Sequence, residues 1–141
     1  MSFRTAIASR PAAVALTAGI VGLTLATAYI HFTLGSLLFL LNAAGYAGLA
    51  AAIVVGAIAP HPFVERFSWL PRLGLAGFTA ATIVGYLVIG PYFSLGYIAK
   101  AIEVGILALL AMDVVRVYGS PAGMVRNAVA SVFGSRAPVA A

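Results

Sequence analysis

Four apolar stretches, each about as long as a bilayer is thick, constrain this sequence more than any other feature. A helix needs about 20 apolar residues to cross the ~30 Å hydrocarbon core of a membrane. Prolines lie near the ends of the stretches, where a missing backbone N–H costs little. The pattern predicts an all-α integral membrane protein whose four spans form a four-helix bundle. The predicted spans cover about 12–31, 35–59, 73–89 and 94–115, so residues 1–117 hold the bundle.

Composition supports a membrane protein over a soluble one. The chain of 141 residues is 63% hydrophobic and 8% charged, whereas soluble domains are roughly 25% charged. A soluble domain this small leaves much of its surface exposed and could not hide so many apolar side chains. The absence of cysteine excludes disulfides and thiol chemistry. No basic run carries interleaved aromatics, so we expect no nucleic-acid partner.

Arginine is distributed unevenly between the segments that connect the predicted spans. Cytoplasmic loops of membrane proteins carry an excess of Lys and Arg. Both terminal segments and the connection between the second and third spans carry arginine, while the two other connections carry none. We therefore expect both termini in the cytoplasm of a multi-pass protein of the plasma membrane. The arginines used are Arg4, Arg10, Arg66, Arg72, Arg116, Arg126 and Arg136.

The first 28 residues also allow a different interpretation. Arg4 and Arg10, the apolar run and the small residues at 26–28 fit a cleaved signal peptide. Cleavage would leave three spans. We favour the uncleaved chain because the apolar run continues into His31 and then turns directly into another span.

The tail, residues 118–141, contains a further helix signal. Ser120 can cap a helix that has Pro121 in its first turn and Gly134 at its end. The helix, about 121–133, is amphipathic and too short to span. We expect it to lie on the inner leaflet with Arg126 near acidic headgroups. A partner-docking or partly disordered tail is the alternative.

Small residues recur every four positions in the first three predicted spans. Such stripes allow close backbone approach, which matters because burial alone does not drive helices together in lipid. We expect the second and third spans to pack along theirs, although an Ala-rich composition can produce this spacing by chance. The stripes are Ala18, Gly22 and Ala26; Ala44, Gly48, Ala52 and Gly56; and Gly77, Ala81 and Gly85.

Two charges interrupt the fourth predicted span. Lys100 and Glu103 are three residues apart, so they share one helix face. Insertion of such a residue at a helix centre costs about 2.5–3.5 kcal/mol. Lysine can extend its stem toward the membrane surface, but glutamate is too short to do so. Glu103 therefore needs a partner, water or a proton.

Polar residues of the other spans fall at a similar depth, mostly in the outer half of the bundle. We predict that they gather around Lys100 and Glu103 as a polar cluster. The cluster is either a structural lock between helices or a pocket for a ligand or ion, and snorkelling toward lipid headgroups is a third possibility. The predicted members are His31, Asn42, Tyr46, Thr82, Tyr86, Lys100 and Glu103.

Enzymatic and cofactor chemistry finds no support in the sequence. A metal site needs three clustered ligands, and His31 with Glu103 supplies two at different depths. His31 and His61 fall at opposite ends of the spans, roughly 30 Å apart, too far to share a haem. No catalytic triad and no phosphate loop is recognisable. We expect no catalytic residues, no metal site and no cofactor.

Two stretches carry a resemblance to a known group of proteins. "YIHFTLGSLLFLLNAAGYAGLA" (29–50) and "RLGLAGFTAATIVGYLVIGPYFSLGYIAKAIEV" (72–104) resemble small, uncharacterised bacterial four-helix integral membrane proteins. The resemblance implies a bacterial inner-membrane protein and no known activity. Small multidrug transporters are also four-helix proteins, but their membrane glutamate lies in the first helix, which has none here.

These observations favour a non-enzymatic membrane protein, an accessory or assembly subunit of a larger membrane complex. The alternative is a small transporter, or a binding protein for a quinone-like or lipid-like ligand, that uses Glu103 and Lys100. The expected partners are the lipid bilayer and either other membrane subunits or further copies of the chain.

Overall fold

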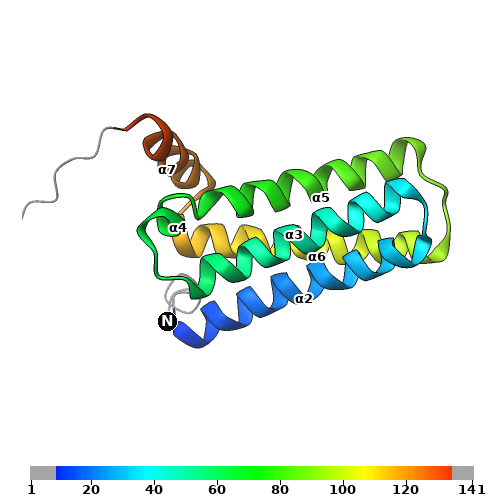
Figure 1. The fold of residues 1–141 in the computed structure, drawn as a ribbon, viewed down its shortest axis with the longest axis horizontal. Coiled ribbons are helices and arrows are strands. Elements are labelled where there is room, and N and C mark those ends of the chain that lie inside the picture. Colours follow the sequence, from blue (N-terminus) through cyan, green and yellow to red (C-terminus); the bar gives the residue numbers. More distant parts are fainter. Residues whose placement is uncertain (1–8, 135–141) are drawn as a thin grey trace, which may run out of the picture.

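The computed structural model describes residues 9–134, and all regular structure in that range is helical. Four long helices run side by side in Figure 1. Three of them, α2, α3 and α5, are long and apolar enough to cross a membrane, which indicates a membrane protein. A short helix, α4, joins α3 to α5, and α7 follows α6. The bounds are α2 Arg10–Leu34, α3 Leu37–Ile58, α4 Pro62–Arg66, α5 Trp69–Ile89, α6 Ser94–Tyr118 and α7 Pro121–Phe133.

The helix bounds differ from the predicted ones mainly at helix starts and turns. α5 begins at Trp69 rather than near residue 73, because Pro71 lies in its first turn, where no backbone N–H is needed. α2 continues past His31 to Leu34 and ends at Gly35, whose positive φ of 73° suits only glycine well. α4 was not predicted. The predicted tail helix, 121–133, matches α7.

The bundle has two different ends. The α2–α3 and α5–α6 connections lie at one end, called here the turn end and made of residues 35–36 and 90–93. The start of α2, together with α4 and α7, lies at the opposite end, called here the α4 end (Figure 1). The predicted cytoplasmic segments within the described range therefore share one end of the molecule.

Side chains from all four long helices form the core. α2 packs on both α3 and α6, and α5 packs on α6 and α3. Large apolar residues fill the centre, and Tyr46 is buried among them. The main members are Ile20, Tyr46, Ile53, Leu75, Ile106 and Leu110.

The prediction that α3 and α5 pack along their small-residue stripes is wrong. Gly48, Gly56 and Gly77 are exposed, and a Cβ added to any of them would meet nothing within 4 Å. Other glycines make the close contacts instead. A Cβ on Gly45 would lie 2.6 Å from the ring of Phe78 on α5. The helices therefore approach by fitting a large side chain over a glycine, rather than backbone against backbone.

α7 is attached to the α4 end through a single turn. Its Ser131 is buried, and the Ser131 carbonyl oxygen accepts hydrogen bonds from the Arg66 guanidinium of α4. The indole N–H of Trp69 donates to the Ser131 hydroxyl at 2.8 Å. The opposite side of α7 is apolar and exposed, with Val125, Val129, Val132 and Phe133.

Candidate functional site

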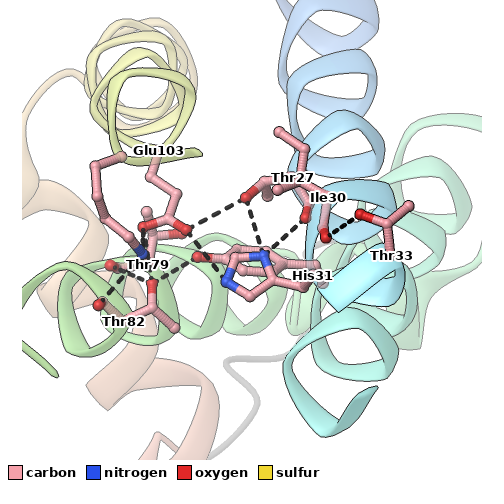
Figure 2. Close-up of polar contacts among 9 residues, drawn as sticks. Thr27, Ile30, His31, Thr33, Thr79, Thr82 and Glu103 are labelled. Carbon is pink, nitrogen blue, oxygen red and sulfur yellow. Dashed lines mark hydrogen bonds and ion pairs between the residues drawn. The ribbon is translucent and has the colours of Figure 1, made fainter. Parts of the chain in front are cut away.

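Glu103 is the centre of the polar cluster and is completely buried. Its Oε2 accepts from Lys100 Nζ at 2.5 Å and from the Thr82 hydroxyl at 3.0 Å. Its Oε1 accepts from the Thr27 hydroxyl at 3.2 Å and lies 3.9 Å from His31 Nε2. Figure 2 shows Thr27 and His31 of α2 approaching the carboxylate from one side and Thr82 of α5 from another. One carboxylate thus joins three helices.

Two pairs of residues in the cluster come from the spacing of residues along single helices. Lys100 precedes Glu103 by three residues on α6, and Thr27 precedes His31 by four on α2. Residues at these spacings lie on the same helix face. The cluster then assembles once α2, α5 and α6 have the correct rotation and relative height.

His31 is held in one orientation. Its Nδ1 lies 2.8 Å from the backbone carbonyl oxygen of Thr27. A carbonyl only accepts hydrogen bonds, so Nδ1 carries the hydrogen and Nε2 is directed toward Glu103. The ring packs against Phe39 and Tyr46 of α3, with centroid distances of 5.9 and 5.6 Å, and the residue is 4% exposed.

Tyr46 extends the network to α3. Its hydroxyl lies 2.7 Å from the Thr82 hydroxyl. A hydroxyl has one hydrogen to donate, so when Thr82 donates to Glu103, Tyr46 must donate to Thr82. Tyr46 then acts on the carboxylate through Thr82, and all four long helices contribute to one connected set of hydrogen bonds.

A cavity of about 370 Å³ adjoins the cluster near the turn end. Its wall is mostly apolar, and it lies between α2, α3, α5 and α6. The polar residues that line it are His31, Asn42, Thr82, Tyr86 and Lys100, and the large apolar ones include Leu34, Leu38, Phe39, Phe78 and Ile89.

The seven predicted site residues fall into two groups. Five of them form the hydrogen-bonded and ion-paired cluster: His31, Tyr46, Thr82, Lys100 and Glu103. The two others, Asn42 and Tyr86, line the cavity, and neither hydrogen-bonds to the five. Lys100 Nζ lies 5.5 Å from the centre of the Tyr86 ring. The predicted set omitted Thr27, although its position four residues before His31 was a usable signal.

A second buried carboxylate lies nearer the α4 end. Asp113 is 2% exposed and binds Arg116, three residues later on the same helix, at 2.6 Å. Arg72 of α5 also binds it at 2.7 Å. The side chains of both arginines are mostly buried, so this triad joins α5 to α6, and its two guanidiniums and one carboxylate carry a net charge of +1.

A larger, more open hollow of about 620 Å³ lies between α4 and α7 and is lined by His61, Arg66 and Asn127 among others. It is remote from the polar cluster, and Arg66 is already bound to Ser131 across it. We regard it as the gap beside the docked helix. Within residues 9–134, no three His, Asp or Glu side chains come close enough to hold a metal ion.

Comparison with protein-family models, with curated proteins and with solved structures finds no match for this chain. The resemblance to small bacterial membrane proteins and the bacterial inner-membrane setting therefore stay predictions.

Proposed function

We propose that this chain is a non-enzymatic membrane protein that binds a small ligand with an apolar body and a hydrogen-bond-accepting head. One observation carries the proposal: the mostly apolar cavity of about 370 Å³ is lined by five of the seven predicted site residues. Ligand sites typically measure about 300–1,000 Å³ and combine an apolar wall with a few polar groups.

Hydrogen-bond donors without an acceptor at the cavity indicate that the polar head of the ligand carries a hydrogen-bond acceptor. An ammonium has three N–H groups. In Lys100, one donates to Glu103 at 2.5 Å and a second donates to the Thr82 carbonyl oxygen at 3.3 Å. Among the described residues, the third meets only the ring face of Tyr86. The Tyr86 hydroxyl is buried and has no hydrogen-bond partner there. Buried polar groups are normally paired, so a ligand oxygen that accepts from both would suit this wall.

The membrane arrangement is part of the proposal. We take α6 as the fourth span, because its charges are paired: Glu103 with Lys100, and Asp113 with two arginines. The described arginines lie toward the α4 end, which we place in the cytoplasm by the positive-inside rule; they are Arg10, Arg66, Arg72, Arg116 and Arg126. The cavity then lies in the outer half of the bilayer.

The orientation has a direct test, because the natural chain has no cysteine. Ser36→Cys places a thiol at the turn end, and Ser120→Cys places one between α6 and α7. A membrane-impermeant thiol reagent applied to intact cells should label the first and leave the second unlabelled until the membrane is permeabilised. The reverse result would reject the proposed orientation.

The accessory-subunit hypothesis is the second candidate, and one observation favours it. Both oxygens of the Glu103 carboxylate are satisfied by protein groups alone, as a structural lock requires. Buried ion pairs of this kind sometimes serve conformational specificity rather than binding. Under this hypothesis the cavity would be filled by a partner helix or by lipid.

Accessibility of the cavity distinguishes the two candidates. Asn42→Cys places a thiol in the cavity wall, while Ala43→Cys, its neighbour on α3, is 7% exposed and serves as the matched control. We expect a water-soluble thiol reagent to label the first variant much faster than the second. Decylubiquinone should slow labelling of the first only. Equal, slow labelling of both variants would support the lock instead.

A further inference from the structure

We propose that the head of the bound ligand is an anion, and that its binding takes up one proton at the His31–Glu103 pair. The inference rests on the proposed ligand-binding function and specifies the chemical class of the ligand. It follows from two features of the cluster: the orientation of the imidazole, and the balance of buried charge around the cavity.

The ring of His31 is oriented so that its Nε2 can bind a proton beside the Glu103 carboxylate. His31 Nδ1 donates its hydrogen to the Thr27 carbonyl oxygen, so the hydrogen of the neutral ring is on Nδ1 and not on Nε2. In the neutral ring, the lone pair of Nε2 then faces Glu103 Oε1 at 3.9 Å. Two acceptors facing each other in a buried site repel, and one added proton turns the contact into an ion pair or a hydrogen bond. The pair is thus arranged to hold one more proton.

Few charged or titratable side chains lie near the His31–Glu103 pair to balance the charge of a bound anion. Among the described residues, the titratable or charged side chains in contact with the pair are Tyr46 from α3 and Lys100 from α6, and Tyr86 from α5 faces Lys100. With His31 neutral, Lys100 and Glu103 cancel. An anion that binds the free donor of Lys100 therefore leaves one uncompensated negative charge.

Uncompensated charge in a buried site is strongly unfavourable. A proton at the pair restores neutrality, and His31 is suited to supply the position because it lines the cavity and also faces Glu103. Histidine is the side chain whose charge ordinarily changes between about pH 5 and 8. Anion binding and proton binding should therefore favour each other.

The test compares two probes with the same alkyl chain. Decanesulfonate stays anionic over the whole pH range, and decanol is uncharged. Binding is measured on the intact protein in lipid nanodiscs, with empty nanodiscs as the blank for partitioning. A pH indicator in weak buffer reports the protons taken up per probe bound. Wild-type protein should take up about one proton per decanesulfonate, and this linked uptake should raise its affinity by up to about tenfold for each pH unit of acidification. Decanol should show neither effect.

His31→Asn separates the proton from the contacts. The asparagine N–H can replace Nδ1–H as donor to the Thr27 carbonyl oxygen, but the amide does not titrate in this range. We expect the variant to take up no proton with decanesulfonate, and we expect the ratio of its decanesulfonate affinity to its decanol affinity at pH 6 to be at least tenfold lower than that of wild-type protein.

The outcomes separate this inference from the proposed function. Binding of decanol or decylubiquinone without binding of decanesulfonate would keep the ligand-binding function and overturn the anion. Binding of decanesulfonate without proton uptake by wild-type protein, or with uptake that persists in His31→Asn, would overturn the role of the pair. Binding of none of the three probes would overturn the proposed function itself.

Discussion

Lys100→Met should destabilise the protein more than Glu103→Gln, although both changes break the same ion pair. The reason is a difference in burial. The Glu103 side chain is fully buried, while 14% of the Lys100 side chain is exposed and lines the cavity. Among the described residues, removing the lysine leaves the carboxylate with two hydroxyl partners and His31. Removing the charge of Glu103 leaves an ammonium that can move into the cavity on its flexible stem.

The expected magnitudes follow from that difference. Removal of one partner from a buried pair costs about 3–5 kcal/mol, because the other charge is left uncompensated. We expect Lys100→Met to fall in this range. For Glu103→Gln we expect about 1–3 kcal/mol, the cost of leaving hydrogen-bonding groups imperfectly paired.

The double variant Lys100→Met/Glu103→Gln tests the origin of the loss. It removes both charges, so it should be more stable than Lys100→Met alone. The two single effects should therefore fail to add, by about 0.5–3 kcal/mol, which is the usual range for residues in one network.

The free energy of unfolding can be measured by titrating mixed micelles with dodecyl sulfate and following the fluorescence of Trp69, the single tryptophan. Arg126→Met is the control, because Arg126 is exposed on α7 and its removal should change stability by less than about 0.5 kcal/mol. Equal losses for the two single variants, or additive losses in the double variant, would refute the reasoning.

Two further predictions use the same measurement. Gly45→Ala should lower the free energy of unfolding by about 1–3 kcal/mol, because the new Cβ would lie 2.6 Å from the Phe78 ring. Gly48→Ala, whose Cβ would meet nothing within 4 Å, should leave stability unchanged or raise it by up to about 1 kcal/mol through helix propensity. Equal effects of the two variants would contradict the observed packing. Asp113→Asn should lower the free energy of unfolding by about 2 kcal/mol, because Arg72 loses a charged acceptor that links α5 to α6. An unchanged midpoint in the dodecyl sulfate titration would show that this triad adds nothing to the stability of the bundle.

The long helices could be predicted from the sequence because length and apolar composition alone determine them. The inward direction of Lys100 and Glu103 could also be predicted, since charged side chains within an apolar helix need partners. The pairing within α6 follows from the spacing of three residues, and the structure shows it at 2.5 Å.

The partners on other helices could be named only as candidates. A spacing argument places residues on one face of one helix, but it does not give the relative height or rotation of two helices. Thr27 was therefore left out, although it donates to Glu103, and Asn42 was included, although it only lines the cavity. Arg72 was assigned to a loop, yet it lies in α5 and binds Asp113.

The error over the small-residue stripes has a geometric cause. Successive residues of an α-helix are rotated by about 100°, so residues two apart point in nearly opposite directions. In α3, Ala44 and Gly48 each lie two positions from Tyr46, which is buried in the polar network. In α5, Gly77 lies two positions from the buried Thr79. Polar side chains and small residues therefore compete for the interior, because one rotation cannot bury both. Exposing a hydroxyl to lipid costs far more than exposing a glycine, so the polar residues set the rotation of each helix and the small stripes face outward.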